Sequence, residues 1–160
     1  MMKNCKQSVS VGRAFPVSPE RLWAIAGHPA RLSDAVAMLR DFQAPKVLDV
    51  GSALAETHTI LGWPQRYIGR ITQFKPVARW GMTSNPQSRG PCPLPHDVLY
   101  QFEKKANGSS LTITCDFQCG GLLALPFVPQ IVAWFMKRTI ANLLSSIADK
   151  IRQSSIPHTA

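Results

Sequence analysis

Apolar residues recur with a helical period along the last long stretch of the chain, from Phe127 to Arg152. Their spacing of three or four residues forms one continuous stripe, which consists of Val132, Met136, Ile140, Leu143, Ile147 and Ile151. The opposite side is polar except in the first turns, where Ile131, Trp134 and Phe135 are apolar too. The pattern predicts a long helix that covers a sheet and begins apolar nearly all round.

The N-terminal part of the chain predicts one strand followed by two short helices. Ser8–Val17 alternates loosely between polar and apolar residues, which is typical of a strand. Ser18, Pro19 and Glu20 then open a helix, because serine is a favoured N-cap and proline fits the first helical position. The apolar positions within Ala30–Leu39 predict a second short helix.

After Pro45 the pattern becomes that of strands separated by turns that contain glycine, proline or asparagine. In the last two strands one face is apolar and the other polar, as an antiparallel sheet with one covered face requires. Asn85–Pro95 is rich in proline and predicts a loop. The strands expected after Pro45 are 46–50, 53–61, 65–74, 78–83, 96–104 and 110–118. Together with the first strand they make about seven. We therefore expect a single α+β domain of residues 1–160, with a core of about 7–154.

Composition and charge agree with one globular domain that has a real core. The 160 residues are 45% hydrophobic and only 17% charged. The net charge is +9, but the basic residues are scattered from Lys3 to Arg152 with no run longer than two. Nucleic-acid-binding proteins usually concentrate such charge on one face or arm. We therefore expect no nucleic-acid partner.

The cysteines and the uncharged stretches indicate a reduced, cytoplasmic protein. Cys5, Cys92, Cys115 and Cys119 show no CxxC spacing and no nearby histidine pair, so neither a zinc site nor a disulfide framework is expected. We expect no other metal and no cofactor either. The N-terminus lacks the apolar core of a signal peptide. Phe117–Met136 contains no charged residue, but glycines and prolines interrupt it. It therefore predicts a strand end, a loop and a helix start rather than a membrane span.

Four short motifs, in order along the chain, support a family resemblance. Val17–Trp23 looks like "V-x-x-P-E-x-V-W", Val50–Leu54 looks like "V-G-x-x-F", Ile71–Pro76 is similar to "V-T-E-F-D-P-P" and Gly108–Thr112 stands where "G-G-T-x-L-T" usually stands. With the order of elements, these motifs resemble the START-like, or helix-grip, superfamily of polyketide cyclases/dehydrases and lipid-transfer proteins. Two departures are Lys75, in place of an acidic residue, and Val77, in place of the second proline.

The resemblance implies a curved sheet that grips the long helix around a cavity for a hydrophobic small molecule or lipid. It implies no catalytic set, because the motifs are structural and functions vary within a fold. Large apolar side chains from neighbouring strands and from the helix fit the walls of such a pocket; the predicted lining is Tyr67, Ile71, Trp80, Met82, Val98, Tyr100, Phe102, Ile113, Cys115, Phe117, Val132, Phe135 and Met136.

Polar candidates for chemistry are few. Glu56 and His58 lie two apart on one strand and so share a face, which is either the cavity or the wet side. Tyr67 and Tyr100 are the other weak catalytic candidates and, together with Arg66 or Arg70, candidate polar anchors. No nucleophile elbow, P-loop or GxGxxG motif is present. The remaining histidines are expected to be exposed to solvent; they are His28, His96 and His158.

Three functions compete. A carrier or sensor of an apolar ligand ranks first, because the pocket follows from the fold while catalytic residues do not stand out. The second is an enzyme of the cyclase/dehydratase type that acts on an aromatic or enolisable substrate. The third is an interaction protein that docks on a membrane or partner. Gly120–Pro126 and the apolar first turns of the long helix predict a movable entrance that contacts ligand, membrane or a second subunit.

Overall fold

The computed structural model describes residues 5–33, 42–60, 63–87 and 93–154. In this part of the chain six antiparallel strands form one sheet, in the order β1-β6-β5-β4-β3-β2. The strands are β1 (Cys5–Phe15), β2 (Ala53–Ile60), β3 (Trp63–Lys75), β4 (Arg79–Pro86), β5 (His96–Lys105) and β6 (Gly108–Cys119). The helices are α1 (Pro19–Ala26), α2 (Pro29–Ser33), the 3-10 turn η1 (Gly121–Ala124) and α3 (Val128–Gln153).

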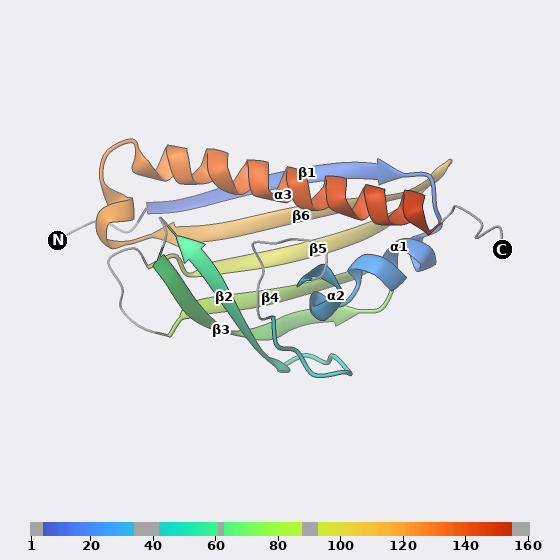
Figure 1. The fold of residues 1–160 in the computed structure, drawn as a ribbon, viewed down its shortest axis with the longest axis horizontal. Helices are drawn as coiled ribbons and strands as arrows, with labels where there is room; N and C mark the ends of the chain where they lie inside the picture. The colour runs from blue at the N-terminus through green and yellow to red at the C-terminus, as the bar shows by residue number, and fades with distance from the viewer. Residues whose placement is uncertain (1–4, 34–41, 61–62, 88–92, 155–160) are drawn as a thin grey trace.

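All the helices lie on one face of the curved sheet. Helix α3 runs lengthwise beside β1 and β6, while α1 and α2 cover the sheet near the C-terminal end of α3 (Figure 1). The predicted stripe of α3 faces inward, and Ile140, Leu143, Ile147 and Ile151 are buried. The predicted class, an α+β fold in which a curved antiparallel sheet packs on a long C-terminal helix, is confirmed.

Helix α1 begins where the sequence predicts. The Ser18 hydroxyl accepts a hydrogen bond from the Arg21 backbone N–H at 3.3 Å, and Pro19 is the first helical residue. This N-cap satisfies a backbone donor that the first turn leaves without a helical partner. Trp23 on this helix packs edge-on against Phe102 of β5, with ring centroids 4.9 Å apart. The cap therefore positions an aromatic contact between α1 and the sheet.

The strand count differs from the expected seven because residues 46–50 form a turn instead of a strand. The Asp49 backbone N–H donates to the Ser52 hydroxyl at 2.9 Å, and the Asp49 carboxylate accepts from the Val50 N–H at 2.8 Å. These local bonds compete with a strand ladder, as short polar side chains often do. Before this turn, Gln43 forms one isolated β-bridge with Ala55 of β2.

Two other predicted boundaries change or cannot be followed. The second short helix is described only as Pro29–Ser33, and residues 34–39 lie outside the described residues. Strand β4 extends to Pro86, into the predicted loop, of which residues 88–92 lie outside the described residues too. In the turn between β3 and β4, Val77 has a φ of 61°. Proline cannot adopt that angle, so the departure from a second proline here matches the observed turn.

Candidate functional site

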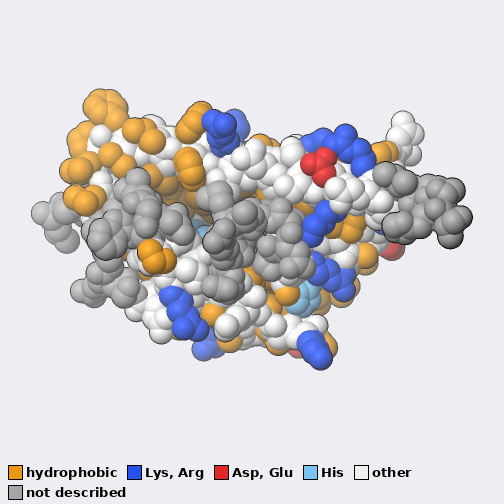
Figure 2. All heavy atoms as spheres, in the orientation of Figure 1, with side chains coloured by type: hydrophobic (Ala, Val, Ile, Leu, Met, Phe, Trp, Pro, Cys, Tyr) orange, Lys and Arg blue, Asp and Glu red, His pale blue; other side chains and the backbone are white. Residues whose placement is uncertain are grey.

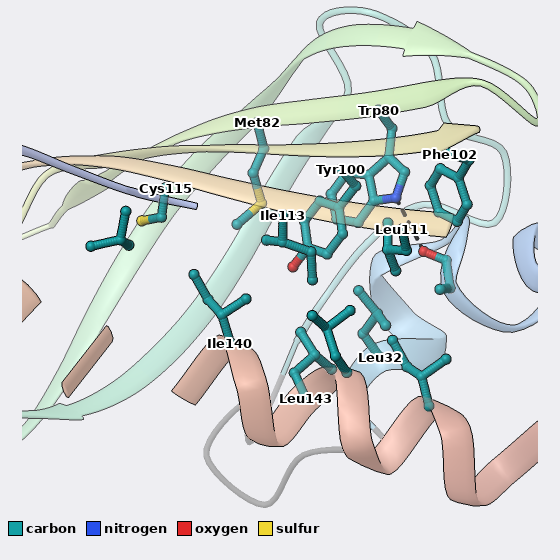
Figure 3. Packing of buried hydrophobic residues seen from close by; sticks show 14 of the residues in the cluster. Leu32, Trp80, Met82, Tyr100, Phe102, Leu111, Ile113, Cys115, Ile140 and Leu143 are labelled. Atoms are coloured by element: carbon teal, nitrogen blue, oxygen red, sulfur yellow. Dashed lines mark hydrogen bonds between the residues drawn. The ribbon is translucent and has the colours of Figure 1, made fainter. Parts of the chain in front are cut away.

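A cavity of about 300 Å³ lies between the sheet and α3. Its walls are almost wholly apolar, as Figure 3 shows for Met82, Tyr100 and Ile113 on the sheet, with Ile140 and Leu143 facing them from α3. Near the α1 end, Trp80 stacks on Tyr100 with ring centroids 4.0 Å apart, and its indole N–H donates to the Ala26 carbonyl at 3.1 Å. This stacked pair forms a rigid wall of the cavity.

The cavity reaches the surface at the first turns of α3. Ile131 and Phe135 line it, yet their side chains are 62% and 51% exposed. They belong to a group of exposed apolar residues, the apolar patch, that comprises Leu122, Leu125, Phe127, Ile131, Trp134 and Phe135. Figure 2 shows hydrophobic side chains gathered at the end of the molecule where η1 leads into α3. The mouth of the cavity is therefore surrounded by apolar groups.

Most of the residues predicted to line the cavity are found there. They are Tyr67, Trp80, Met82, Val98, Tyr100, Ile113, Cys115, Val132, Phe135 and Met136. Ile71, Phe102 and Phe117 are buried but do not border it, which corrects the prediction for these three. They share the covered face of the sheet without bordering the cavity, and Phe102 packs against Trp23 of α1 instead.

A buried polar cluster interrupts the apolar wall. Glu56 on β2 is only 2% exposed, and its Oε2 lies 3.2 Å from His58 Nε2. Its Oε1 lies 3.3 Å from His96 Nε2 on β5 and accepts a hydrogen bond from the Ser84 hydroxyl on β4. Glu56, His58 and His96 all line the cavity. The shared face of Glu56 and His58 is therefore the cavity face, which their spacing alone left open.

The prediction that His96 is exposed to solvent is wrong, because only 7% of the residue is accessible. The signal was present in the sequence: His96 alternates in register with Val98, Tyr100 and Phe102 along β5, so it belongs to the covered face. His96 Nδ1 lies 2.9 Å from the Leu94 carbonyl oxygen. A carbonyl only accepts, so Nδ1 carries a proton and Nε2 faces Glu56.

Glycine at position 69 makes room for this cluster. Gly69 lies on β3, between Leu54 of β2 and Ser84 of β4 in the sheet register. A Cβ added there would lie 3.2 Å from the Ser84 hydroxyl oxygen and 2.7 Å from the Thr83 carbonyl oxygen. The missing side chain therefore lets Glu56 reach across β3 to Ser84.

The cluster strongly changes the acidity of its members. Burial alone would raise the pKa of Glu56, but the two imidazoles beside its carboxylate outweigh burial and hold that pKa well below 4.5. Burial alone would lower the pKa of His96, but the Glu56 carboxylate outweighs it and raises that pKa above 6.5. An ionised carboxylate and a protonated imidazole therefore favour each other inside an otherwise apolar cavity.

Of the other predicted polar groups, Tyr67 lies beside the cluster, and the two arginines lie outside the cavity. The Tyr67 hydroxyl donates to the Gln65 side chain at 3.1 Å, and its ring packs on His58 and His96 with centroids 5.0 and 5.4 Å away. Arg66 and Arg70 are exposed, because strand residues at odd spacings from Tyr67 face the other side of the sheet. They are therefore excluded as cavity anchors.

Two further groups in the wall stay uncharged. Burial, together with the charge of Glu56, raises the pKa of Tyr100 above its ordinary value of 10.0. Burial raises the pKa of Cys115 to about 12. A thiol with that pKa is a poor nucleophile at neutral pH. The chemistry that this wall can support therefore rests on Glu56, His58 and His96.

Comparisons with known proteins identify a fold but no family. No protein-family model and no curated protein matches this chain. A protein from Thermus thermophilus is 14% identical, with a TM-score of 0.76 over 94% of this chain and 100% of its own. A Staphylococcus aureus protein of unknown function is 12% identical, with a TM-score of 0.72 over 96% and 98%.

A third similar structure is that of Ara h 8.0201, which has the helix-grip fold. It is 13% identical, with a TM-score of 0.62 over 91% of this chain and 99% of its own. At this level of identity the likeness shows the fold alone. This chain is thus a helix-grip protein with an internal cavity. None of its described helices is long and apolar enough to cross a membrane.

Proposed function

We propose that this protein binds a compact hydrophobic molecule carrying one polar group, in the cavity between the sheet and α3. The observation that carries the proposal is the apolar cavity of about 300 Å³ with the cluster of Glu56, His58 and His96 in one wall. Ligand pockets are typically 300–1,000 Å³, mostly apolar, with a few polar groups that orient the ligand. A protein that served only to dock on partners would be expected to fill this space with its own side chains.

The dimensions of the cavity support a compact ligand over a long-chain lipid, because the volume is at the lower end of the usual range. The polar part of the ligand would face the cluster, and the rest would contact Met82, Ile113 and Met136. Native mass spectrometry of the purified protein tests this directly. A co-purified small molecule of matching size supports the proposal, and its structure would identify the polar group.

Filling the cavity should weaken ligand binding. Val98 lines the cavity from β5, so Val98→Phe places a larger side chain in the space a ligand would occupy. We expect affinity for an apolar fluorescent dye to fall at least tenfold, because about 1.4 kcal/mol of binding free energy corresponds to a factor of ten. Dye titration measures this, and thermal melting checks that the variant folds.

The matched control is Phe117→Leu. Phe117 is as buried as the cavity residues but does not border the cavity. This variant should lose stability, since a large side chain is shortened in the core, while dye affinity stays unchanged. Equal dye affinity in the wild type and Val98→Phe would place the binding site elsewhere.

We propose further that the apolar patch is the rim of the entrance and contacts a membrane surface. Exposed apolar patches normally mark contact surfaces, and the net charge of +9 would favour anionic lipid. Trp134 is 59% exposed and touches Arg138, whose guanidinium lies 5.6 Å from the indole ring. The patch therefore offers an apolar group and a cation side by side.

Trp134→Ser tests the patch. The free energy of unfolding should change by about 0.5 kcal/mol or less, as for other surface sites, while flotation with anionic vesicles should decrease. Asn142→Ser, at an exposed polar position further along α3, serves as a control that should leave both unchanged. A stability loss of several kcal/mol would instead mark Trp134 as part of the core, and unchanged flotation would reject the membrane contact.

A second candidate function, proton transfer on an enolisable substrate, is favoured by one observation. The carboxylate of Glu56 contacts two imidazoles at a cavity wall, and imidazoles are the commonest general acid–base groups. Incubating the co-purified compound with the protein in D₂O separates the candidates. Deuterium incorporation that depends on His58 supports an enzyme, and its absence supports a carrier.

A further inference from the structure

We propose that Glu56, His58 and His96 bind a divalent transition-metal ion, with Zn²⁺ as the best match, in the wall of the cavity. One ligand atom from each residue lies within 4.8 Å of the other two. Two imidazole nitrogens and one carboxylate are a donor set that zinc accepts. This metal site is a proposal separate from the proposed binding of a hydrophobic molecule, and it does not depend on it.

Each imidazole nitrogen of the cluster lies, from one oxygen of the Glu56 carboxylate, at the spacing expected between two ligands of the same ion. With metal–ligand bonds of about 2.0–2.1 Å, neighbouring ligand atoms around a tetrahedral ion are about 3.3 Å apart. Glu56 Oε2 lies 3.2 Å from His58 Nε2, and Glu56 Oε1 lies 3.3 Å from His96 Nε2. Because these are the two different oxygens of one carboxylate, an ion would bind both imidazoles after a shift of one side chain. The ring of His58 is partly accessible, with 23% of its side chain exposed, so it has room to turn toward an ion.

The surrounding hydrogen bonds orient the donors as in metal sites. His96 Nδ1 donates to the Leu94 carbonyl at 2.9 Å, which leaves Nε2 facing the cluster. The Ser84 hydroxyl donates to Glu56 Oε1. Ligating histidines almost always donate their second N–H in this way, and ligating carboxylates are themselves hydrogen-bonded.

Two buried atoms of the cluster lack hydrogen-bond partners among the described residues. They are Glu56 Oε2 and His58 Nε2, which face each other at 3.2 Å as an ion-pair contact. Leaving such buried groups without partners is costly, and each one calls for a reason. A cation placed between them would coordinate both atoms, which accounts for their orientation toward each other.

Three protein ligands would leave the ion an open position toward the apolar cavity. Catalytic zinc sites keep a fourth position for water or substrate, whereas structural sites use four protein ligands. The thiol of Cys115 is not part of the set: among the described residues, the ligand atoms that gather within 4.8 Å of one another belong to Glu56, His58 and His96. The open position would therefore accept an oxygen of a molecule in the cavity.

Metal binding by the untagged, EDTA-treated protein tests the proposal. Isothermal titration with ZnCl₂ should show one Zn²⁺ per chain, and affinity should fall as pH is lowered because protons compete for the imidazoles. His58→Ala should lower the affinity at least tenfold. His28→Ala is the matched control: His28 bonds to the Pro45 carbonyl outside the cavity, and its loss should leave Zn²⁺ binding unchanged.

A second readout excludes incidental binding. Co²⁺ in place of Zn²⁺ should give visible d–d absorption that persists in Cys115→Ser and disappears in His58→Ala, with circular dichroism showing that both variants are folded. Absence of stoichiometric Zn²⁺ binding, or equal binding by His58→Ala and the wild type, would overturn the proposal. The dye titration proposed above is to be carried out on EDTA-treated protein, so that its outcome does not depend on metal binding.

Discussion

A chain that ends at Pro126 is expected not to fold. Removing α3 exposes the sheet face that Ile140, Leu143, Leu144, Ile147 and Ile151 cover, and each of these residues is at most 6% exposed. Losing a single buried Leu or Ile side chain typically costs about 2–5 kcal/mol. Five such losses come to about 10–25 kcal/mol, which is as large as or larger than the roughly 5–15 kcal/mol by which a domain is stable. Circular dichroism and thermal melting should therefore show no cooperative transition.

The control for this truncation is a chain that ends at Ser154. It keeps all of α3, including the hydrogen bond from the Ser154 backbone N–H to the Lys150 carbonyl, and should melt like the full-length protein. A truncation at Pro126 that stayed monomeric and melted cooperatively would show that the sheet is stable without α3 and would contradict the role of this helix as its cover.

Replacing Glu56 by alanine is expected to cost about 3–5 kcal/mol of stability at pH 5.5 in EDTA. The substitution leaves His96 buried without its carboxylate, so that burial disfavours the charged imidazole, and removing one partner of a buried ion pair typically costs this much. Chemical denaturation measures the loss. Glu103→Ala is the control: Glu103 forms an exposed pair with Lys105 at 2.7 Å, and such pairs contribute little. Equal losses in both variants would contradict the buried pair.

The same pair predicts how stability depends on pH in the metal-free protein. The lowered pKa of Glu56 contributes stability that is present above its unfolded value of 4.5 and is lost as pH falls through the folded value. The raised pKa of His96 contributes stability that is present below 6.5 and is lost as pH rises through the folded value. Both contributions are complete only between pH 4.5 and 6.5.

The stability difference between the wild type and the double variant Glu56→Gln/His96→Gln should therefore be greatest near pH 5.5 and decrease on both sides. Denaturation curves at a series of pH values measure this difference. A difference that grew steadily toward pH 8 would mean that His96 is neutral in the folded protein and that the pair is not ionic.

The sequence alone determined the elements of this fold. The spacing of the apolar stripe predicts α3, and the exposed Ile131, Trp134 and Phe135 are the residues that fall outside it. Ser18 and Pro19 predict the start of α1, and alternation predicts β5 and β6. These features are local, because capping and side-chain periodicity depend on residues only a few positions apart. The prediction of a strand at 46–50 was wrong because of another local effect: polar side chains in this segment bond to nearby backbone N–H groups.

The tertiary structure alone decided which of the inward residues meet. Alternation places Ile71, Phe102 and Phe117 on the same face as Tyr100 and Ile113, but it does not say how far along the strands the cavity extends. Alternation also does not predict the contact between Glu56 and His96, because β2 and β5 are separated by β3 and β4. In a flat sheet, three interstrand steps of about 4.8 Å would hold them about 14 Å apart. The curvature of the sheet and the missing side chain at Gly69 bring their side chains to 3.3 Å, and that contact exists only in the folded chain.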